Sequence, residues 1–538
     1  MTPERYDVVV LGGALAGAST ALLLRRRHPE LRVLVVERSP AFDWKVGEST
    51  VEISAYFLTR VLRLFTHLSE EQLPKHGLRF WFHNGKVTRL QEASESGPGQ
   101  LPRLPTFQLD RQKLDEHVLS LAVREGADLW RPAKVVEVRL PEETGLPEGH
   151  LRIERDGETI EVQAGWIVDA TGRAAVIARK RGWLHPIEEH PTSAIWARYR
   201  GVKDLDSPEI TGLDPGDPFV RSVLAARRLG TNHFTGYGYW MWFIPLQGGE
   251  MSIGAVWDTR LIRPLGNSPE ERLRWFIEGN PLSRELARDA TAVPGDLRAY
   301  ALLPYLVDRI AGAGWTMVGD AAGFLDPFYS PGIDQISFSV SWTLELIKRS
   351  RMNPDPAEFS TLLADHNEGY TRYLKYFFEA IYLDKYHLMG DFDLMTASML
   401  IDTSLYYFFN VIPTYRWSHR FLLVPPFYHR GAKRALPFIG LHRRRLVSIA
   451  RRKMKLGIYG DRNAGQRPKL LGFTLGWTTV RMFLKGLWFW ARAEALNAWS
   501  YIARPRPMKA SMPGPLSIPE PAEEPAVPPK AAAPGRLP

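Results

Sequence analysis

Short apolar runs and one amphipathic segment alternate over the first forty residues. The run YDVVVLGG predicts a buried strand that ends in a glycine turn, and LRVLVVE predicts a second strand that ends at Glu37. Between them, the segment from about Ala16 to Arg27 predicts a helix. Because both strands are almost continuously apolar, we expect a parallel sheet that is covered on both faces. The pattern therefore predicts a strand, turn, helix and strand over residues 6–38.

The pattern changes further along the chain. Alternating apolar and polar residues predict largely β segments at about 77–106 and 185–305, and a strand, a loop and a long helix follow. We expect these parts to form one unit over residues 1–350, into which the β segments are interleaved. Residues 358–503 are aromatic and helical in pattern, whereas Pro and Ala dominate residues 504–538, which predicts a disordered tail.

Composition narrows the class of protein. The chain has 538 residues, of which 45% are apolar and 24% charged, and this balance is typical of a soluble globular protein with a large core. It has no cysteine, which excludes disulfides, thiolate metal sites and cysteine nucleophiles, and we expect no metal site. The start is not a signal peptide, and no stretch reaches the ~18 uncharged apolar residues of a membrane span. We therefore expect a cytoplasmic protein.

The net charge of +10 is concentrated in one region. From Thr403 to Gly460 there are 12 Lys or Arg and no Asp or Glu. The clusters at 443–445 and 451–455 lie in a helical pattern with aromatic neighbours. This region is interpreted either as a helical cap over the active site or as a basic surface for peripheral contact with an anionic membrane or an acidic partner protein. No nucleic-acid partner is expected, because no recognition module accompanies the charge.

The turn after the first strand carries the pattern of a dinucleotide-binding site. Glycine permits a tight turn and a close approach of the backbone to a pyrophosphate, which the start of the following helix then faces. Glu37 lies 20 residues after Gly17 and is placed to accept hydrogen bonds from a ribose diol. The unit by itself is compatible with NAD or with FAD. The candidate residues of the turn are Gly12, Gly13, Ala14, which replaces the middle glycine, Ala16 and Gly17.

Three further segments resemble those of the para-hydroxybenzoate hydroxylase-like flavoproteins. They are QLDR at 108–111, DATG at 169–172 and VGDAA at 318–322. The resemblance implies an α/β fold with a Rossmann-like FAD-binding domain, an interleaved β-sheet substrate domain and a helical C-terminal region. It implies FAD as the cofactor. The FAD-binding residues expected outside the glycine turn are Glu37, Arg38, Glu48, Ser49, Arg111, Asp320, Pro327, Gly332 and Ile333.

Four segments resemble the flavin-dependent halogenases. WMWFIP at 240–245 fits W-x-W-x-I-P, FLDPFYSPG at 324–332 fits F-x-x-P-x-x-S-x-G, KVGEST at 45–50 is similar to their GES segment, and KHGLRF at 75–80 matches K-x-G-x-x-F. The resemblance implies an enzyme in which reduced flavin and O₂ convert a halide into hypohalous acid.

The same resemblance implies roles for particular residues. Lys75 would hold or carry the electrophilic halogen beside an electron-rich aromatic substrate, and burial suits this role because desolvation lowers the pKa of an amine. Ser330 belongs to the segment that cradles the halide, and Trp240 and Trp242 would screen the flavin from the substrate. No second glycine fingerprint for NAD(P)H follows a strand. We therefore expect reduced flavin from a separate reductase or from transient NAD(P)H.

Two positions depart from the halogenase pattern. Tyr329 stands where the tryptophan halogenases have a glutamate, so the phenol and pyrrole halogenases, many of which act on carrier-tethered substrates, are the closer resemblance. Pro331 has no N–H and removes one of two amide donors for the halide. It favours the alternative of a flavin-dependent monooxygenase, or a geranylgeranyl-reductase-like oxidoreductase, without halide chemistry. A further alternative is a flavin-binding protein without turnover.

The candidate residues also have purely structural interpretations. Lys75 follows Pro74 in a polar segment, and a loop lysine of this kind is usually solvated. Trp240 and Trp242 alternate along a strand and would then be two core aromatics on one face. The burial and the neighbours of these side chains distinguish the two interpretations.

Overall fold

A mostly parallel sheet forms the centre of the N-terminal half in the computed structural model, which describes residues 3–502 except 100–101, 213, 215–226, 353, 424–429 and 469. The strand order is β19-β20-β10-β1-β2-β7, and β10 continues into an antiparallel meander with β9 and β8. The predicted tail at 504–538 lies outside the described residues. The strands are β1 (Glu4–Leu11), β2 (Val33–Val36), β7 (Asp128–Trp130), β8 (Lys134–Arg139), β9 (Gly149–Arg155), β10 (Glu158–Asp169), β19 (Ala311–Gly312) and β20 (Trp315–Met317).

The predicted first unit is present at the centre of this sheet. β1 pairs in parallel with β2 on one side and with β10 on the other. Between β1 and β2 the chain forms α1 (Leu15–Arg27), which packs on α4 (Arg111–Arg124). The apolar run of β2 is buried throughout, as expected for a strand that is covered on both faces.

A second sheet combines segments that are far apart in the sequence. Its order is β16-β12-β15-β14-β13-β4-β5, and β17 also pairs with β12. β4, which comes from the predicted segment 77–106, lies parallel to β13 from the segment 185–305. The strands are β4 (Leu78–Phe82), β5 (Ser94–Ser96), β12 (Thr192–Arg200), β13 (Thr231–Gly236), β14 (Tyr239–Pro245), β15 (Met251–Asp258), β16 (Thr291–Ala292) and β17 (Arg298–Tyr300).

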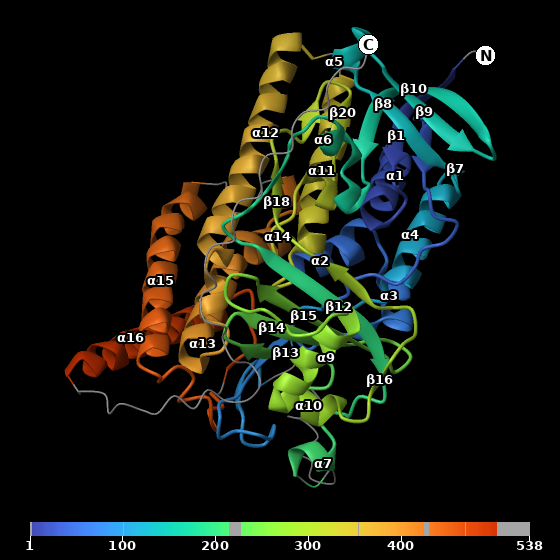
Figure 1. Ribbon diagram of the computed structural model, residues 1–538. Helices are drawn as coiled ribbons and strands as arrows, with labels where there is room; N and C mark the ends of the chain where they lie inside the picture. Colours follow the sequence, from blue (N-terminus) through green and yellow to red (C-terminus); the bar gives the residue numbers. More distant parts are fainter. Residues whose placement is uncertain are drawn as a thin grey trace, which may run out of the picture.

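The two faces of the second sheet meet different parts of the protein. Helices α9 (Pro269–Gly279) and α10 (Pro281–Ala287) cover one face, where Met241 and Phe243 are buried (Figure 1). The side chains of Trp240 and Trp242 point to the opposite face and join the large core that includes the C-terminal helices. This alternation follows from the two-residue period of a strand.

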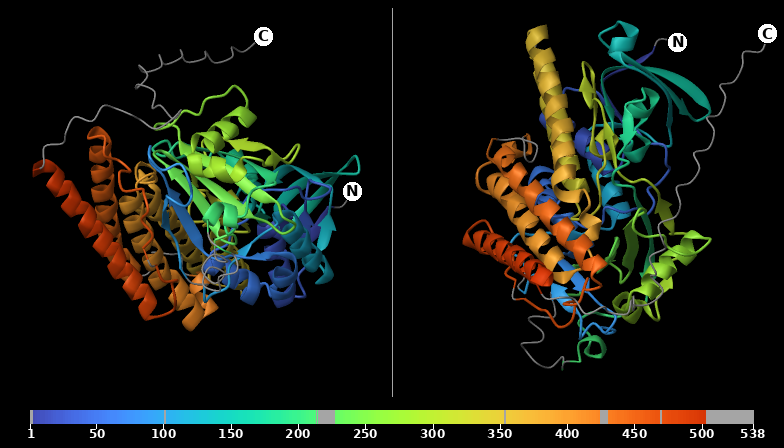
Figure 2. Two further views of the ribbon diagram at one scale, coloured as in Figure 1. Left: turned by 90° about the horizontal axis from the view of Figure 1, so that it is seen from below. Right: turned by 60° about the vertical axis from the view of Figure 1, so that its left-hand side comes forward.

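Long helices form the C-terminal half: α11 packs on α1 beside the parallel sheet, whereas α13, α15 and α16 lie side by side farther from it (Figures 1 and 2). α13 packs extensively against α16, and α15 contacts both. None of the helices in the described part of the chain has the length and apolar character needed to cross a bilayer. The helices are α11 (Gly332–Ser350), α12 (Pro356–Phe377), α13 (Phe392–Tyr406), α14 (Ile412–Arg416), α15 (Arg430–Lys455) and α16 (Trp477–Ile502).

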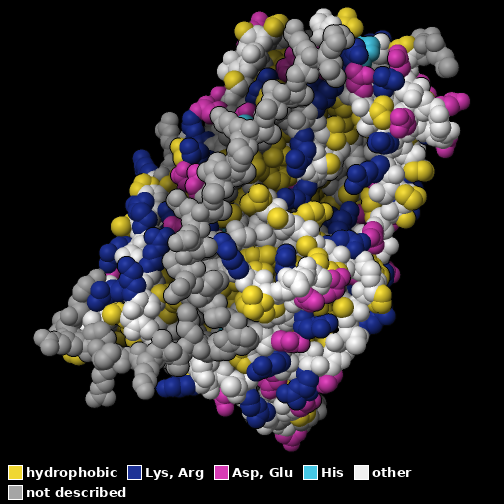
Figure 3. Space-filling model, in the orientation of Figure 1, with side chains coloured by type: hydrophobic (Ala, Val, Ile, Leu, Met, Phe, Trp, Pro, Cys, Tyr) yellow, Lys and Arg dark blue, Asp and Glu magenta, His cyan; other side chains and the backbone are white. Residues whose placement is uncertain are grey.

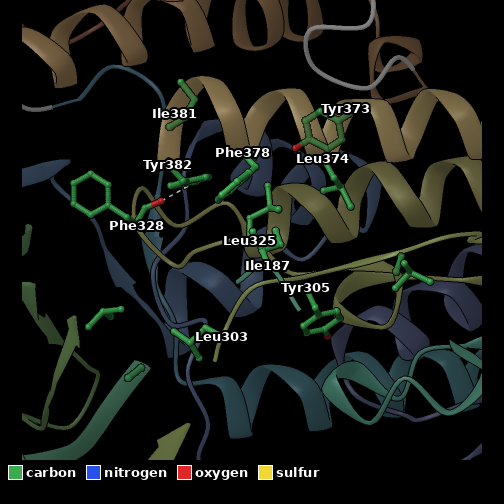
Figure 4. Close-up of a cluster of buried hydrophobic side chains, with 14 of the residues drawn as sticks. Ile187, Leu303, Tyr305, Leu325, Phe328, Tyr373, Leu374, Phe378, Ile381 and Tyr382 are labelled. Carbon is green, nitrogen blue, oxygen red and sulfur yellow. Dashed lines mark hydrogen bonds between the residues drawn. The ribbon is translucent and has the colours of Figure 1, made fainter. Parts of the chain in front are cut away.

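The helical half shares its core with the N-terminal half. Leu325 and Phe328, from the loop before α11, pack with Phe378 and Tyr382 after α12 (Figure 4). The Tyr382 hydroxyl donates a hydrogen bond to the carbonyl of Phe328 at 3.0 Å. Short bridges also join residues 93 and 98 to residues 464 and 470. The C-terminal helices are therefore built onto the site region and do not form a separate bundle.

The remaining described elements are short and connect these parts. They are α2 (Glu52–Tyr56), the π-helical turn η1 (Phe57–Val61), α3 (Phe65–Glu71), β3 (Leu73–Pro74), β6 (Phe107–Gln108), α5 (Pro141–Thr144), η2 (Gly172–Ala174), α6 (Val176–Lys180), β11 (Leu184–Pro186), α7 (Pro208–Thr211), β18 (Tyr305–Val307), η3 (Gly319–Ala322), η4 (Phe378–Tyr382), η5 (Lys385–His387), η6 (Tyr407–Val411) and η7 (His419–Leu423).

Candidate active site: a dinucleotide cradle beside a buried lysine

The glycine turn between β1 and α1 leaves no room for side chains. Gly12 has φ of 96°, and a Cβ atom at this position would lie 2.6 Å from the carbonyl oxygen of Ala170. A Cβ atom on Gly17 would overlap the carbonyl oxygen of Gly12. The turn therefore lies directly against the DATG turn that follows β10. Ala14, at the position of the missing middle glycine, is accommodated as the residue that precedes α1.

Three motifs meet at the start of α1. Ala14 forms no side-chain cap, so the first N–H groups of the helix are not capped by the residue before it. The GDAA turn, η3, lies on the other side, where a Cβ atom on Gly319 would be 3.3 Å from the Cβ of Ala16. An open helix N-terminus between two glycine turns fits the pyrophosphate of a dinucleotide.

Glu37 is fixed at the end of β2, beside the glycine turn. Its Oε2 accepts a hydrogen bond from the backbone N–H of Gly13 at 2.8 Å, and its Oε1 accepts one from the N–H of Ser39 at 2.8 Å. A carboxylate oxygen can accept two hydrogen bonds, so each still has capacity for a ribose hydroxyl. The predicted neighbour Arg38 is exposed to solvent.

Buried charges line the other side of the cradle. The Arg111 guanidinium donates to Asp115 and, at 3.2 Å, to the carbonyl of Val46, which ties α4 to the GES loop. Burial raises the pKa of Asp320 in the GDAA turn, and the nearby Arg173 and Arg111 partly offset this rise. These positions are suited to the polar groups between the two rings of FAD.

Glu48 lies deeper than the sequence suggests. Only 3% of the residue is exposed, and burial raises its pKa to about 7. The nearest cation is Arg198, at 3.5 Å, and both Oε2 of Glu48 and Nη2 of Arg198 are buried without a hydrogen-bond partner. Unpartnered buried polar groups are costly, and a bound polar group next to this pair would relieve the cost. Together with the glycine cradle, this arrangement fits FAD.

Lys75 is buried and not solvated, although it follows Pro74 in a polar segment. It is 2% exposed, and its Nζ donates to Ser49 Oγ at 2.7 Å and to the carbonyl of Thr50 at 2.6 Å. Both acceptors are neutral. Burial lowers the pKa of the amine from 10.5 to about 7, although two carboxyl groups farther away oppose the change. The pairing of β3 with β6 fixes the backbone there.

One cavity contains Lys75 and the motif loop that precedes α11. The empty space, which includes solvent at its opening, is about 1190 Å³. Tyr329 and Pro331 line it on either side of Ser330, and α13 and the segment 470–473 form a further wall. The structure thus brings Lys75 and the F-x-x-P-x-x-S-x-G motif together, across more than 250 residues of sequence.

The motif loop has an unusual backbone. Tyr329 has φ of 70° and Ser330 has φ of 58°, a left-handed conformation that non-glycine residues rarely adopt. The N–H of Ser330 donates to the carbonyl of Pro327 at 2.9 Å, and α11 starts at Gly332 with Ile333 buried. Residues held in this conformation concentrate at functional sites, where the surrounding structure enforces it.

Hydrogen bonds from the C-terminal half hold Tyr329 in place. Its hydroxyl donates to Asp402 Oδ2 at 3.1 Å, and the same oxygen accepts bonds from Lys385 and Ser398. Lys385 and Asp402 form a buried ion pair, with Lys385 2% exposed. In contrast to Lys75, Lys385 therefore has a carboxylate partner.

Two carboxyl groups on the cavity wall were not among the predicted site residues. Asp334 is 5% exposed and accepts hydrogen bonds from Ser54 and, at 2.8 Å, from the hydroxyl of Tyr406. Glu52 accepts one from Tyr407 at 2.6 Å. Burial raises the pKa of Asp334 to about 7. The sequence does hold a signal for Asp334, because it is an acid two residues after a motif glycine and the one charged residue between 332 and 344 of α11.

The tryptophan pair braces the motif loop. Trp240 Nε1 donates to the Tyr386 hydroxyl at 3.0 Å, which in turn donates to Asp326 Oδ2 at 3.0 Å. The ring of Trp240 also packs on Phe328, with 5.2 Å between centroids. Trp242 is buried on the same face of β14. The pair is thus part of the core, as the structural interpretation expects, and it also supports the loop beside the cavity.

A single methyl group at the glycine turn is expected to remove the cofactor. In Gly17→Ala the new Cβ would overlap the carbonyl of Gly12, so the turn must open and can no longer follow a pyrophosphate. We expect the purified variant to lose the flavin absorbance near ~450 nm. Gly476→Ala is the matched control, because its backbone is not left-handed and a Cβ there would lie 4.0 Å from the nearest neighbouring atom. Normal flavin content in Gly17→Ala would contradict the assignment.

Comparison with known proteins supports a flavin-dependent site. No protein-family model matches the chain. A flavin-dependent halogenase, chlA, of Dictyostelium discoideum is 27% identical over 379 residues, which cover 64% of this chain and 60% of the relative. The sulochrin halogenase gedL of Aspergillus terreus is 25% identical, covering 69% of this chain and 68% of the relative. The tetracycline 7-halogenase of Kitasatospora aureofaciens is 26% identical, covering 63% of each chain.

Solved structures show the same fold. The halogenase PltM in complex with phloroglucinol and FAD superimposes with a TM-score of 0.66 at 16% identity, covering 91% of this chain and 96% of PltM. The myxobacterial chondrochloren halogenase CndH gives 0.59 at 19% identity, with 90% and 98% covered. These comparisons confirm the α/β fold and the predicted resemblance to the flavin-dependent halogenases. The match to chlA spans less than two thirds of that relative's length.

Proposed function

We propose that this chain is an FAD-dependent oxidoreductase that halogenates an electron-rich aromatic compound in the cavity beside Lys75. The observation that carries the proposal is the position of the Lys75 amine. It is buried, neither of its two hydrogen-bond acceptors is a carboxylate, and it lines the same cavity as the motif loop. We assign FAD binding to residues 1–350, with the β-sheet segments 77–106 and 185–305 as the substrate part. Residues 358–503 then close the cavity.

The overall reaction converts an aromatic C–H bond into a carbon–halogen bond. Bound FAD would supply, in its reduced form, the two electrons and two protons that O₂ needs to oxidise the halide to hypohalous acid, so that the arene, hydrogen halide, O₂ and reduced FAD give the halogenated arene, oxidised FAD and two water molecules. A separate flavin reductase is the proposed source of electrons. The substrate is a small aromatic compound, either free or tethered to a carrier protein.

Lys75 transfers the halogen in this proposal. A neutral amine is the nucleophile that takes the halogen from hypohalous acid, with release of water, and a pKa of about 7 leaves much of the amine neutral at neutral pH. The N–halogen bond then breaks as the ring carbon bonds to the halogen. The hydrogen bonds to Ser49 and Thr50 hold Nζ at the cavity wall.

Asp334 is placed to accept the proton that leaves the ring. Its carboxyl group lines the same cavity, and its pKa of about 7 suits a general base that works near neutral pH. The proton finally returns to the lysine nitrogen, so the enzyme regains its starting state. The hydroxyl of Tyr406 and the side chain of Ser54 keep the carboxyl group oriented.

The start of α11 supplies the remaining amides for a halide. Gly332 and Ile333 are the first residues of a 19-residue helix, where backbone N–H groups are free of intrahelical partners. Pro331, which lacks an N–H, lines the cavity just before them. This proline is also the observation that favours the second candidate function, a flavin-dependent monooxygenase without halide chemistry.

A reconstituted assay distinguishes the two functions. The purified chain is combined with FAD, a flavin reductase, NADH and bromide, and monochlorodimedone or a panel of phenols is analysed by mass spectrometry. We expect a brominated product that requires both bromide and O₂. Oxygenated product without bromine would support the monooxygenase and reject halogenation. Flavin binding without any product would leave only the flavin-binding role.

Neutralising Asp334 is expected to slow the reaction without loss of FAD. Asp334→Asn keeps the shape and the hydrogen bond with Tyr406 but cannot take up a proton, and loss of a general base costs roughly 10²-fold or more in kcat. The measurement is steady-state bromination with flavin content as the control. Asp365→Asn, on the exposed side of α12, is the matched variant and should be unchanged. Full activity in Asp334→Asn would exclude Asp334 as the base.

A further inference from the structure

The outward face of α16 is almost entirely apolar. α16 forms the outer edge of the helical half in two views of the molecule, and its inner side packs on α13 (Figure 2). Trp477 is 77% exposed, Trp488 55% and Trp499 64%. Arg481 is the one charged side chain among the fully exposed positions of residues 477–500. The others are Trp477, Leu484, Trp488, Ala491, Ala495, Leu496, Ala498 and Trp499.

These exposed residues form a continuous stripe. The positions 477, 484, 488, 491, 495 and 499 follow each other at helical spacing, so they share one side of α16, and we call them the Trp stripe. From Trp477 to Trp499 the stripe is about 33 Å long at 1.5 Å per residue. An ordinary surface helix turns its polar face to water. A long exposed apolar stripe with large aromatics instead indicates an interaction surface.

The helix that packs beside α16 is strongly basic. α15, which packs beside α16, contains no Asp or Glu, and the one acid on α16, Glu494, is paired with Arg445 at 2.7 Å. Arg444, Arg451 and Lys455 of α15 are exposed, and basic side chains gather over α15 in Figure 3. Other basic residues of the predicted surface are bonded to groups within the protein.

Some basic residues of α15 face the protein interior instead. Arg443 donates to the carbonyl of Leu383, and Lys453 pairs with Asp391. The structure therefore divides the basic clusters of the sequence into residues that fix α15, among them Arg451 beside Asp384 at 3.5 Å, and residues that face solvent on this helix next to α16. Only the second group can attract a partner.

We propose that the Trp stripe of α16 docks on an anionic lipid surface. Tryptophan is favoured at the boundary between water and the bilayer, and exposed Lys and Arg beside it attract anionic headgroups. Arg481, between Trp477 and Leu484, is the one exposed charged side chain on this side of α16, and apolar residues fill the rest of it, whereas an acidic protein partner would need several basic side chains inside the contact. No helix among the described residues is able to span a bilayer, so α16 lies on the surface and not across it.

Docking in this way has a consequence for the cavity. The segment Leu470–Phe473 forms one wall of the cavity, and α16 begins only four residues after Phe473. The Trp477 end of the stripe is therefore connected to this wall by a short segment of chain. The docking itself does not depend on the proposed halogenation.

Vesicle co-sedimentation of the full chain tests the proposal. Vesicles of phosphatidylcholine alone are compared with vesicles that also contain about 30% phosphatidylglycerol, and we expect at least about tenfold more protein bound to the anionic vesicles. Added salt should weaken the binding, because it screens the attraction of the basic residues.

A matched pair of variants distinguishes vesicle binding through the Trp stripe from nonspecific binding through other exposed apolar side chains. The variant with Trp477→Ser, Trp488→Ser and Trp499→Ser should lose about tenfold or more of the binding, since the apolar contact is removed. The control carries Phe65→Ser and Leu265→Ser, which are 60% and 63% exposed elsewhere on the surface, and should bind like the unmodified chain. Flavin content and the melting curve report whether each variant is folded.

Three results would overturn the proposal. The first is equal binding to neutral and anionic vesicles, or binding to neither. The second is a dimer in analytical ultracentrifugation that the Trp stripe variant dissociates, which would make a second copy of the chain the partner. The third is saturable binding of an acidic carrier protein that is lost in the stripe variant while vesicle binding persists.

Discussion

Lys75→Met is expected to abolish halogenation while leaving FAD in place. The variant keeps a side chain of similar length in a buried site but has no nitrogen to take the halogen, and removal of such a catalytic group costs roughly 10²- to 10⁴-fold or more. Hypohalous acid should still form and escape, so NADH consumption continues without a halogenated product. The measurement is the ratio of brominated product to NADH consumed.

The same variant is expected to be more stable than the unmodified chain. The pKa of Lys75 is about 7 when folded against 10.5 ordinarily, so the unfolded chain binds a proton that the folded chain does not bind between these pH values. The burial of Lys75 therefore costs no stability above about pH 10.5. Its cost to the free energy of unfolding grows as the pH falls and levels off below about pH 7. Lys75→Met removes this cost but also removes the hydrogen bonds that Nζ donates. We therefore expect the free energy of unfolding to rise by about 2 kcal/mol at pH 7.

The pH profile of the unmodified chain gives a second measurement. The rate should rise with pH through about 7, because Lys75 becomes neutral and Asp334 loses its proton over the same range. In Asp334→Asn the remaining rise should move to lower pH, since the Asp334 carboxylate opposes the depression of the pKa of Lys75. A Lys75→Met variant that brominates at the normal rate would remove Lys75 from the mechanism.

Breaking the ion pair between Lys385 and Asp402 is expected to be the most damaging change for stability. Lys385→Met leaves the buried Asp402 with only the hydroxyl groups of Tyr329 and Ser398, and an uncompensated buried charge costs about 3–5 kcal/mol. Tyr329 would keep its hydrogen bond to Asp402 but lose the one that Lys385 donates to its hydroxyl at 3.4 Å, which loosens the motif loop. The measurement is the free energy of unfolding in denaturant, with FAD removed.

A double variant provides the control. Lys385→Met combined with Asp402→Leu removes both charges and should recover most of the lost stability, because apolar replacement of a buried pair is often neutral. If the double variant is no more stable than Lys385→Met alone, the pair does not act as a unit. Arg349→Met, which breaks the exposed pair with Glu345, should cost less than about 1 kcal/mol.

Motifs whose function depends on local geometry could be predicted well. Gly17 is needed because a Cβ atom there would overlap the carbonyl oxygen of Gly12, and this steric rule operates within a few residues of the chain. The strand at β2 and the acid at its end follow from an apolar run and a fixed spacing. The α/β unit could be predicted for the same reason, whereas FAD and the candidate Lys75 were indicated by the resemblance of short motifs to those of known flavoproteins.

The burial of the ionisable groups could not be predicted in this way. Lys75 stands in a polar segment, and its environment is set by Thr106, by Ser49 and by helices that lie hundreds of residues later in the chain. Asp334 and Asp402 became parts of the site only because α11 and α13 face the same cavity. The sequence alone does not indicate which acidic side chains of these helices are buried.

The amino-acid sequence by itself determined which segments form the nucleotide cradle, because sterics and hydrogen bonding act over a few residues. The tertiary structure decided that Lys75 is a buried amine in a cavity shared with the motif loop, and that Lys385 is paired. It also decided which basic residues remain outside and that the tryptophans of α16 face solvent. These properties depend on desolvation and packing, which arise only when distant segments meet.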